Sequence, residues 1–191
     1  MKLTFIRHGS TQWNKEKRAQ GSSDIPLDKE GREDAEKLAE RLETEKWDAL
    51  FSSPLQRAKQ TADIISRKVG LHIKFDPRLR EAGGGQIEGT TEEERVGKWG
   101  ENWRSLELGM EKPESVVKRS LSFMEDLAEE NAPGVNIIVV SHGGVISYLL
   151  RELDPDNIKV EHMKNTSVTE VVLKEGKWVC DRFNCTLHLE K

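Results

Sequence analysis

The chain has 191 residues, 34% of them charged and 35% hydrophobic, and a formal net charge of -4 at pH 7. This length suits one domain with a small additional segment and allows a sizeable core. A weakly acidic chain has no general basic surface, so we expect neither nucleic acid nor an anionic membrane as a partner. No apolar run approaches the roughly 18 residues that span a bilayer, and the first residues follow a strand pattern in place of a signal peptide. We expect a cytoplasmic protein that is a monomer or a homodimer.

Short apolar runs alternate with helical patterns along most of the chain. In chain order, the predicted elements are strand 3–6, helix 28–45, strand 49–51, helix 54–69, strand 71–75, helix 113–131, strand 135–140, helix 144–153 and strands 168–173 and 178–183. Apart from Asn136, the run Val135–Val140 is apolar, which is typical of a strand covered on both faces. Glu175-Gly176 predicts the turn of a hairpin between the last two strands.

Two of these helices carry clear local signals. In the first, Leu38 and Leu42 recur on one face at helical spacing. In the second, we interpret Ser53 as the N-cap and Pro54 as the first helical residue, where a missing N–H costs nothing. Ser52 and Ser53 are therefore interpreted primarily as capping residues.

Strands that alternate with helices predict an α/β fold, because each crossover helix returns the chain to the start of a parallel neighbour. We expect three layers, αβα, around a mostly parallel sheet of about six strands with an antiparallel edge. Residues 84–112 do not fit the alternation, being glycine-rich and then acidic, with Trp99 and Trp103 on a helix-like face. We predict that they form a cap inserted into a single domain of residues 1–191.

Charged and imidazole side chains gather where the predicted strands end. The first strand is followed by Arg7-His8-Gly9, the second by a helix with Arg57 in its first turn, the third by Arg80-Glu81 and the fourth by Ser141-His142-Gly143-Gly144. Because the carboxyl ends of parallel strands meet at one edge of a sheet, we expect these groups to share a site. Two imidazoles and several guanidiniums beside helix amino termini suit a phosphoryl group, whose oxygens accept hydrogen bonds.

Such a site is typical of phosphoryl transfer, in which fixed positive groups stabilise the charge of the transition state. A neutral imidazole can attack phosphorus and leave again, and its ordinary pKa near 6.5 keeps much of it neutral at pH 7. Glu81 is then the candidate general acid and base, and the pairing predicts a bell-shaped rate profile on the acid side of neutrality. Since arginines and histidines supply the positive charge, we expect no metal and no cofactor.

The motifs resemble those of the histidine phosphatase superfamily, which contains cofactor-dependent phosphoglycerate mutases and many phosphomonoesterases. RHGSTQWN at 7–14 is similar to its opening signature, and SSPLQRAKQTA at 52–62 is similar to its second. LRE at 79–81, VSHGG at 140–144 and NTSVTEV at 165–171 continue the pattern in order. The resemblance covers nearly the whole chain and implies a phosphoglycerate mutase-like fold.

By that resemblance, His8 is the phosphorylated nucleophile, Glu81 is the acid and base, and three further residues bind the phosphoryl oxygens. These three are Arg7, Arg57 and His142. The implied substrate-binding residues are Asn14, Thr11, Gln20, Gly21 and Gly143. The sequence departs from the family at Gly83-Gly84-Gly85, which replaces a commonly bulkier stretch and predicts extra backbone freedom beside Glu81.

We predict a metal-independent phosphomonoester hydrolase that acts on a small phosphorylated metabolite. The compact length and the small residues after His142 favour a phosphatase over a phosphoglycerate mutase, which is the alternative among enzymes. A catalytically weak, phosphate-binding regulatory module is the alternative from another class, and the triple glycine is the feature that suggests it. GGGQIEG at 83–89 is not a dinucleotide fingerprint, and SHGG at 141–144 lacks the elbow of serine hydrolases. Cys180 and Cys185 are too few for a disulfide framework, so we expect reduced thiols.

Overall fold

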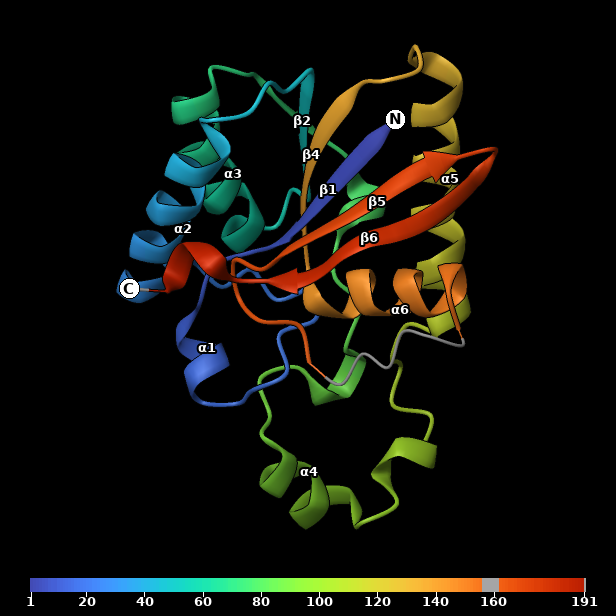
Figure 1. Cartoon of the computed structure of the whole chain (residues 1–191). Helices are drawn as coiled ribbons and strands as arrows, with labels where there is room; N and C mark the ends of the chain where they lie inside the picture. Colours follow the sequence, from blue (N-terminus) through green and yellow to red (C-terminus); the bar gives the residue numbers. More distant parts are fainter. Residues whose placement is uncertain (156–161, 191) are drawn as a thin grey trace.

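The computed structural model describes residues 1–155 and 162–190 and is built around a six-stranded sheet (Figure 1). Its strands are β1 Lys2–Arg7, β2 Ala49–Ser52, β3 Ile73–Phe75, β4 Asn136–Ser141, β5 Val168–Lys174 and β6 Lys177–Cys185. Their order across the sheet is β3-β2-β4-β1-β5-β6. The first four in this order run parallel, whereas β5 runs antiparallel to β1 and β6 antiparallel to β5. The predicted fold class, a mostly parallel sheet with an antiparallel edge, is confirmed.

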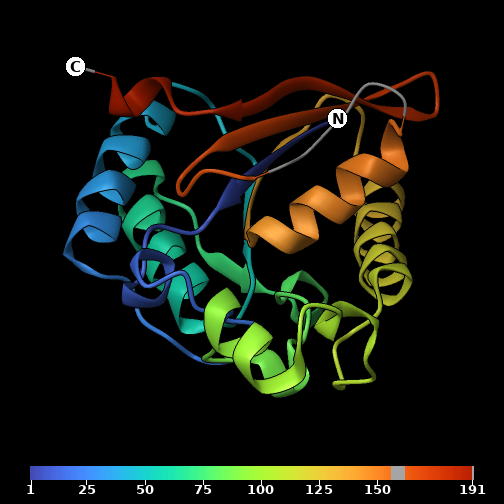
Figure 2. The same ribbon diagram turned by 90° about the horizontal axis from the view of Figure 1, so that it is seen from below.

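Helices cover both faces of this sheet. The α-helices are α1 Gln12–Lys15, α2 Lys29–Leu42, α3 Gln56–Val69, α4 Glu92–Trp99, α5 Pro113–Glu130 and α6 Gly143–Leu153. Short 3₁₀ turns occur at η1 Pro77–Leu79, η2 Gly85–Ile87, η3 Trp103–Ser105 and η4 Leu187–Leu189. Helices α2 and α3 lie on one face, and α5 and α6 lie on the other (Figures 1 and 2). Within the described part of the chain, no helix combines the length and apolarity needed to cross a membrane.

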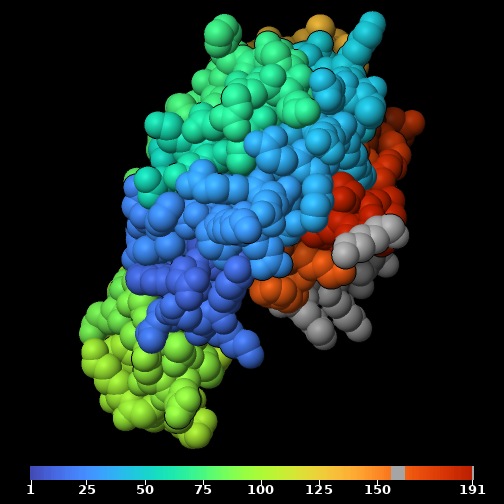
Figure 3. All heavy atoms as spheres, turned by 90° about the vertical axis from the view of Figure 1, so that its left-hand side faces the viewer, coloured from blue at the N-terminus to red at the C-terminus, as the bar shows by residue number. Residues whose placement is uncertain are grey.

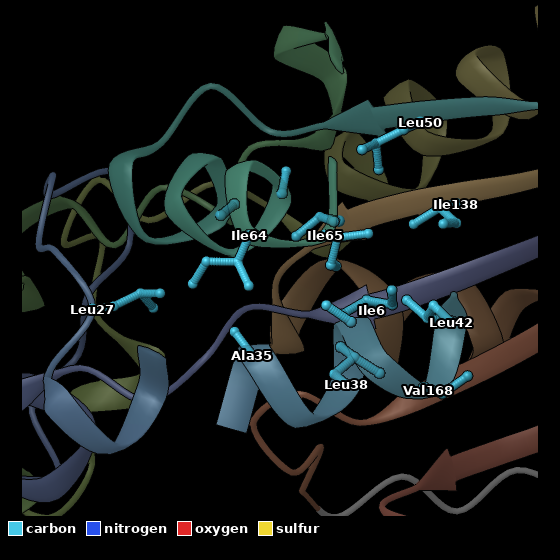
Figure 4. Close-up of a cluster of buried hydrophobic side chains, with 14 residues drawn as sticks. Ile6, Leu27, Ala35, Leu38, Leu42, Leu50, Ile64, Ile65, Ile138 and Val168 are labelled. Atoms are coloured by element: carbon cyan, nitrogen blue, oxygen red, sulfur yellow. The ribbon is translucent and has the colours of Figure 1, made fainter. Parts of the chain in front are cut away.

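Two apolar clusters fill the two sides of the sheet. On one side, Ile6 of β1 packs with Leu38 of α2 and Ile65 of α3 (Figure 4). On the other side, Phe5 of the same strand packs with Phe123 of α5. Neighbouring strand residues thus serve different clusters, because side chains alternate across a strand. This explains why β1 and β4 are each buried at five consecutive positions and not at every second one.

Two predicted boundaries are wrong. The helix predicted from Pro54 begins two residues later, at Gln56, and its N-cap is Leu55, without a side-chain capping bond. Ser53 stands two residues before the N-cap, and its hydroxyl contacts a histidine of the site described below. The third strand was expected to include His72, but β3 is shorter, and His72 lies in the exposed connection that follows α3.

Residues 84–112 lie beyond the carboxyl end of the sheet and contain α4, η2 and η3 (Figure 1). In a space-filling view they form a green lobe against the blue loop after α1 (Figure 3). The contact is partly backbone, since Gly89 N–H donates to the Ala19 carbonyl at 2.8 Å. A small cluster of its own stabilises the lobe: the indole N–H of buried Trp103 donates to Glu92 at 2.9 Å. Residues 84–112 therefore form a small packed lobe beside the carboxyl ends of the strands.

Candidate active site

Three parallel strands deliver their last residues to one place. Arg7 at the end of β1 pairs in register with Ser141 at the end of β4, and the backbone N–H of His8 donates to the Ser141 carbonyl at 3.0 Å. The ring of His8 lies 5.1 Å, between centroids, from the ring of His142. On the other side of β4, Ser53 N–H donates to the Val140 carbonyl at 2.9 Å. The sheet order therefore places the two histidines side by side.

His8 is buried, and its hydrogen bonds fix which ring nitrogen carries the proton. Nδ1 lies 2.7 Å from the Gly9 carbonyl oxygen. A carbonyl can only accept, so Nδ1 is the protonated nitrogen and Nε2 keeps its lone pair. The amide of Asn165, in the loop before β5, donates to the His8 carbonyl at 3.0 Å and holds the backbone of this turn. His8 is thereby held as an imidazole with the proton at Nδ1 and a lone pair at Nε2.

Gly9 allows this turn to pack directly against α2. A Cβ placed on Gly9 would lie 2.4 Å from the Gly31 carbonyl oxygen, and one on Gly31 would lie 2.1 Å from the Ser10 carbonyl oxygen. Both distances are far below van der Waals contact, so neither position accepts a side chain without displacing backbone. The Gly9 N–H also donates to Thr61 Oγ1 at 3.0 Å. These contacts keep the carbonyl of Gly9 at the position that orients His8.

Two buried arginines supply positive charge. Arg57 is fully buried in the first turn of α3, and its guanidinium donates to the carbonyls of Ser23 at 2.7 Å and Gly21 at 2.8 Å. Arg7 donates to the Met163 carbonyl. Burial lowers the pKa of Arg57 to about 10 and lowers the pKa of Arg7 as well, so both remain charged at pH 7. Among the described residues, the Nε–H groups of both arginines are buried without a partner, and such donors suit an anion.

His142 is the second imidazole and stands at the N-cap of α6. It is fully buried, its Nε2 lies 2.8 Å from Ser53 Oγ, and its Nδ1 has no partner among the described residues. Burial, followed by the charge of Arg57, lowers the pKa of His142 well below its ordinary value, and the same two causes act on His8. Both imidazoles are therefore neutral in the ligand-free protein at pH 7.

Glu81 also lies at the amino terminus of α6, the helix that His142 caps. Its carboxylate accepts from the N–H groups of Gly144 and Val145, both at 3.2 Å, in the first turn of α6. The segment that carries it is tied to β4, because Ser141 Oγ donates to the Leu79 carbonyl at 2.9 Å. The helix amino terminus thus binds the carboxylate that the sequence marked as the acid and base.

Gly144 is expected to be essential for the position of Glu81. A Cβ on Gly144 would lie 2.5 Å from Glu81 Oε1, the far end of a flexible side chain. Gly144→Ala should therefore displace the carboxylate and lower kcat by about tenfold or more, while the melting temperature changes little. Gly97→Ala is the matched control, because no atom lies within 4 Å of a Cβ on that helical glycine. Equal kcat values for the two variants would contradict this role.

The sequence predicts extra backbone freedom at Gly83-Gly84-Gly85, but the structure shows these residues in specific contacts. The Gly83 N–H donates to Glu111 at 3.1 Å, and the Gly84 N–H donates to Glu88 at 2.9 Å. A Cβ on Gly85, whose φ is +53°, would lie 2.3 Å from the Leu108 carbonyl oxygen. Gly85 thus permits close backbone packing against Leu108, and the amides of Gly83 and Gly84 are bound by carboxylates.

The predicted substrate-binding residues fall into three places. Thr11, Asn14 and Gln20 form one hydrogen-bonded group, in which the Thr11 hydroxyl lies 3.1 Å from Asn14 Oδ1 and 3.0 Å from Gln20 Oε1. Gly21 lies beside Arg57, and a Cβ on it would come within 2.2 Å of a carboxylate oxygen. Gly143 lies against Arg7, and a Cβ placed on Gly143 would lie 3.2 Å from Nε of Arg7. Their contact with substrate stays a prediction.

Sequence reasoning missed four residues that hold this site together. Asn165 supports the His8 carbonyl, and Thr61 accepts from the Gly9 N–H. Glu88 accepts from the N–H groups of Ser22 and Gly84 and from the Ser23 hydroxyl. Ser53 contacts His142. Asn165 and Ser53 lie within segments that the motif comparison covered, but only the strand order shows what they contact.

An open cleft lies next to Glu81, between the strand ends and residues 84–112. Its volume is about 470 Å³, within the range of small-molecule sites. The sheet side contributes Gly21, Glu81 and Gly144, and the lobe contributes residues 84, 87, 104–108 and 110–112. A group that leaves phosphorus beside Glu81 therefore has room to lie in this cleft.

The lowered pKa values predict a protein whose stability falls in mild acid. In the unfolded chain His8 and His142 titrate near 6.5, so below that pH the unfolded state binds more protons than the folded state. The free energy of unfolding should fall as pH drops from 6.5 to 5, by up to about 1.4 kcal/mol per pH unit for each histidine. His162 and His188, whose pKa values are also lowered, act in the same direction. Urea unfolding at several pH values measures this slope, and an unchanged slope in His8→Gln would contradict it.

Comparison with known proteins places the chain in a family. Residues 3–186 match the histidine phosphatase superfamily (branch 1). The chain is 33% identical over 192 residues to the uncharacterized phosphatase PhoE of Bacillus subtilis, covering 98% of this chain and 96% of the relative. It is 34% identical to phosphoglycerate mutase-like protein 4 of Arabidopsis thaliana, covering 99% of this chain and 87% of the relative.

Solved structures agree with this placement. Bacillus stearothermophilus YhfR superposes with a TM-score of 0.88 at 29% identity, covering 99% of each chain. A mycobacterial glucosyl-3-phosphoglycerate phosphatase, solved in complex with VO3, superposes with a TM-score of 0.87 at 27% identity, covering 96% of this chain and 98% of the other. Phosphatases and phosphoglycerate mutase-like proteins are thus both among its relatives. The chain belongs to branch 1 of the histidine phosphatase superfamily.

Proposed function

We propose that this protein is a metal-independent phosphomonoester hydrolase that forms a phosphohistidine at His8. One observation carries the proposal: the Nδ1–H of His8 is bound to the Gly9 carbonyl, which leaves the Nε2 lone pair free in a site with two buried guanidiniums. Neutral imidazole is the form that attacks phosphorus, and fixed cations stabilise the charge of the transferring group. The family relationship supports the same chemistry.

The reaction follows from the positions of these groups. The phosphoryl oxygens bind Arg7, Arg57 and His142, Nε2 of His8 attacks phosphorus, and the bond from phosphorus to the ester oxygen breaks. Glu81 gives its proton to the departing oxygen. In the second step Glu81 takes a proton from water, the water oxygen attacks phosphorus, the nitrogen–phosphorus bond breaks, and inorganic phosphate leaves. The first step ends with the phosphohistidine and an ionised Glu81, and the second step restores neutral His8 and protonated Glu81, so the cycle is closed.

In this proposal residues 84–112 act as a cap that receives the leaving group. Ile87, Leu106 and Met110 give the cleft beside Glu81 an apolar wall, and Lys112 adds a positive charge. A volume of about 470 Å³ is larger than glycerate needs. This favours small phosphorylated metabolites with a bulkier or partly apolar alcohol.

The test compares hydrolysis with phosphoryl exchange. Purified protein is given a panel of sugar phosphates, nucleotides, phosphoserine and aryl phosphates, and released inorganic phosphate is measured. Exchange between 2- and 3-phosphoglycerate is measured in parallel, because relatives carry mutase names. We expect phosphate release from at least one ester at a rate above that of exchange. Exchange without net release would favour the mutase, and neither activity would favour the regulatory module.

A further inference from the structure

Ser53 makes a contact that the proposed mechanism leaves unexplained. Its side chain comes from the turn between β2 and α3, is fully buried, and lies 2.8 Å from Nε2 of His142. The backbone N–H of Leu55 donates to the same hydroxyl at 3.3 Å. Ser53 is thus held by its neighbours on one side and by an imidazole of the site on the other.

Counting protons around this hydroxyl gives one consistent assignment. The Leu55 N–H can only donate, so it takes one lone pair of the Ser53 oxygen. Among the described residues, Nε2 of His142 is the one acceptor within hydrogen-bond distance of this hydroxyl, so the hydroxyl hydrogen donates to Nε2. A neutral imidazole has one N–H, and the pKa of His142 is lowered mainly by burial. With Nε2 accepting from Ser53, that one N–H must be at Nδ1.

Nδ1 is also the atom that the site needs as a donor. It is fully buried, has no partner among the described residues, and belongs to the ring adjacent to His8. A phosphoryl oxygen offers only lone pairs, so an unprotonated Nδ1 would repel it. The opposite tautomer would place the only N–H of His142 against Ser53 and leave a bare nitrogen toward the phosphoryl group.

We propose that Ser53 is a positioning residue that holds His142 in the Nδ1–H tautomer, so that His142 donates a hydrogen bond to a phosphoryl oxygen. The functional half of this assignment rests on the proposed phosphatase activity. The tautomer itself does not, since it is a property of the ligand-free protein. Ser53 acts through His142 and does not contact the substrate.

Ser52 provides a matched control. It is the preceding residue, equally buried, and its hydroxyl donates to the Ser53 backbone carbonyl at 2.9 Å. Ser52→Ala and Ser53→Ala remove the same atom from adjacent buried positions, but only the second removes a group that contacts His142. Ser53→Thr keeps a hydroxyl and tests rescue.

The experiment is long-range ¹H–¹⁵N NMR of the imidazoles in the ligand-free protein, with His142 assigned from a His142→Gln variant. We expect a protonated Nδ1 and a bare Nε2 in the parent, in Ser52→Ala and in Ser53→Thr, and a change toward Nε2–H in Ser53→Ala. Orthovanadate affinity and kcat should fall about 10-fold to 100-fold in Ser53→Ala, the scale of a hydrogen bond to a charged group.

A protonated Nε2 in the parent spectrum would overturn the assignment, even if Ser53→Ala fails to fold. An unchanged tautomer and unchanged orthovanadate affinity in a folded Ser53→Ala would overturn it too. If no phosphoester is hydrolysed, yet the tautomer and orthovanadate binding depend on Ser53, the positioning role is supported and the proposed hydrolase function is the part that fails.

Discussion

Replacement of His8 by alanine should lower turnover of every phosphoester by on the order of 10⁴-fold or more, because it removes the nucleophile and with it the covalent path. The change should have a modest effect on folding, since among the described residues the ring hydrogen-bonds only to the carbonyl of the next residue. Inorganic phosphate release measures the loss. Peptide mapping after an alkaline quench, which preserves an acid-labile phosphohistidine, should locate phosphate on His8 in the parent and nowhere in the variant.

His72→Ala is the control for this variant. His72 is exposed in the connection before the amino end of β3, whereas the site lies at the carboxyl ends of the parallel strands, and the mechanism gives it no role. Its turnover should equal that of the parent. A phosphorylated peptide that persists in His8→Ala, or a parent enzyme that turns over without any labelled histidine, would contradict the phosphohistidine mechanism.

Glu81→Gln should separate substrates by their leaving groups. An alkoxide needs a proton as it departs, whereas a nitrophenolate leaves readily without one. We therefore expect kcat to fall by about 10²-fold to 10⁴-fold for alkyl phosphates and by much less for p-nitrophenyl phosphate. Orthovanadate should still bind, because Arg7, Arg57 and His142 are unchanged.

Glu111→Gln is an informative comparison for Glu81. Glu111 also lines the cleft and accepts from the Gly83 N–H, but it is paired with Arg119 at 2.9 Å and has no place at the helix terminus. Its substitution should not change the ratio of alkyl to aryl turnover. If Glu81→Gln lowers kcat equally for alkyl and aryl phosphates, the carboxylate positions the site but does not deliver the proton.

Much of this protein was readable from local patterns. Each predicted strand and helix outside residues 84–112 corresponds to an observed element, because a strand and a helix impose different periodicities on apolar residues. Parallel strands bring their carboxyl ends to one edge, so the sequence alone assigns Arg7, His8 and His142 to one site. The order of motifs along the chain then identified the family.

Tertiary structure alone decided what the small polar residues do. Ser53 carries a strong capping signal, yet the pairing of β2 with β4 sets Ser52 opposite Val140, so Ser53 lies beside His142 and its hydroxyl bonds the imidazole instead. Asn165 is 157 positions from the carbonyl it supports, and the antiparallel placement of β5 on β1 brings the two together. Hydroxyls and amides have several possible partners, and local sequence does not rank them.

The glycines show the same division. The sequence shows the positions of the glycines, and the three at Gly83–Gly85 predict extra backbone freedom. In the fold, Gly9, Gly85 and Gly144 instead allow close packing, since a Cβ on each would collide with backbone or with Glu81. Periodicity is a property of one segment, so the sequence by itself determines the elements and the residue types at the strand ends. Contact is a property of two segments, so only the packed structure determines which atoms meet and which nitrogen holds the proton.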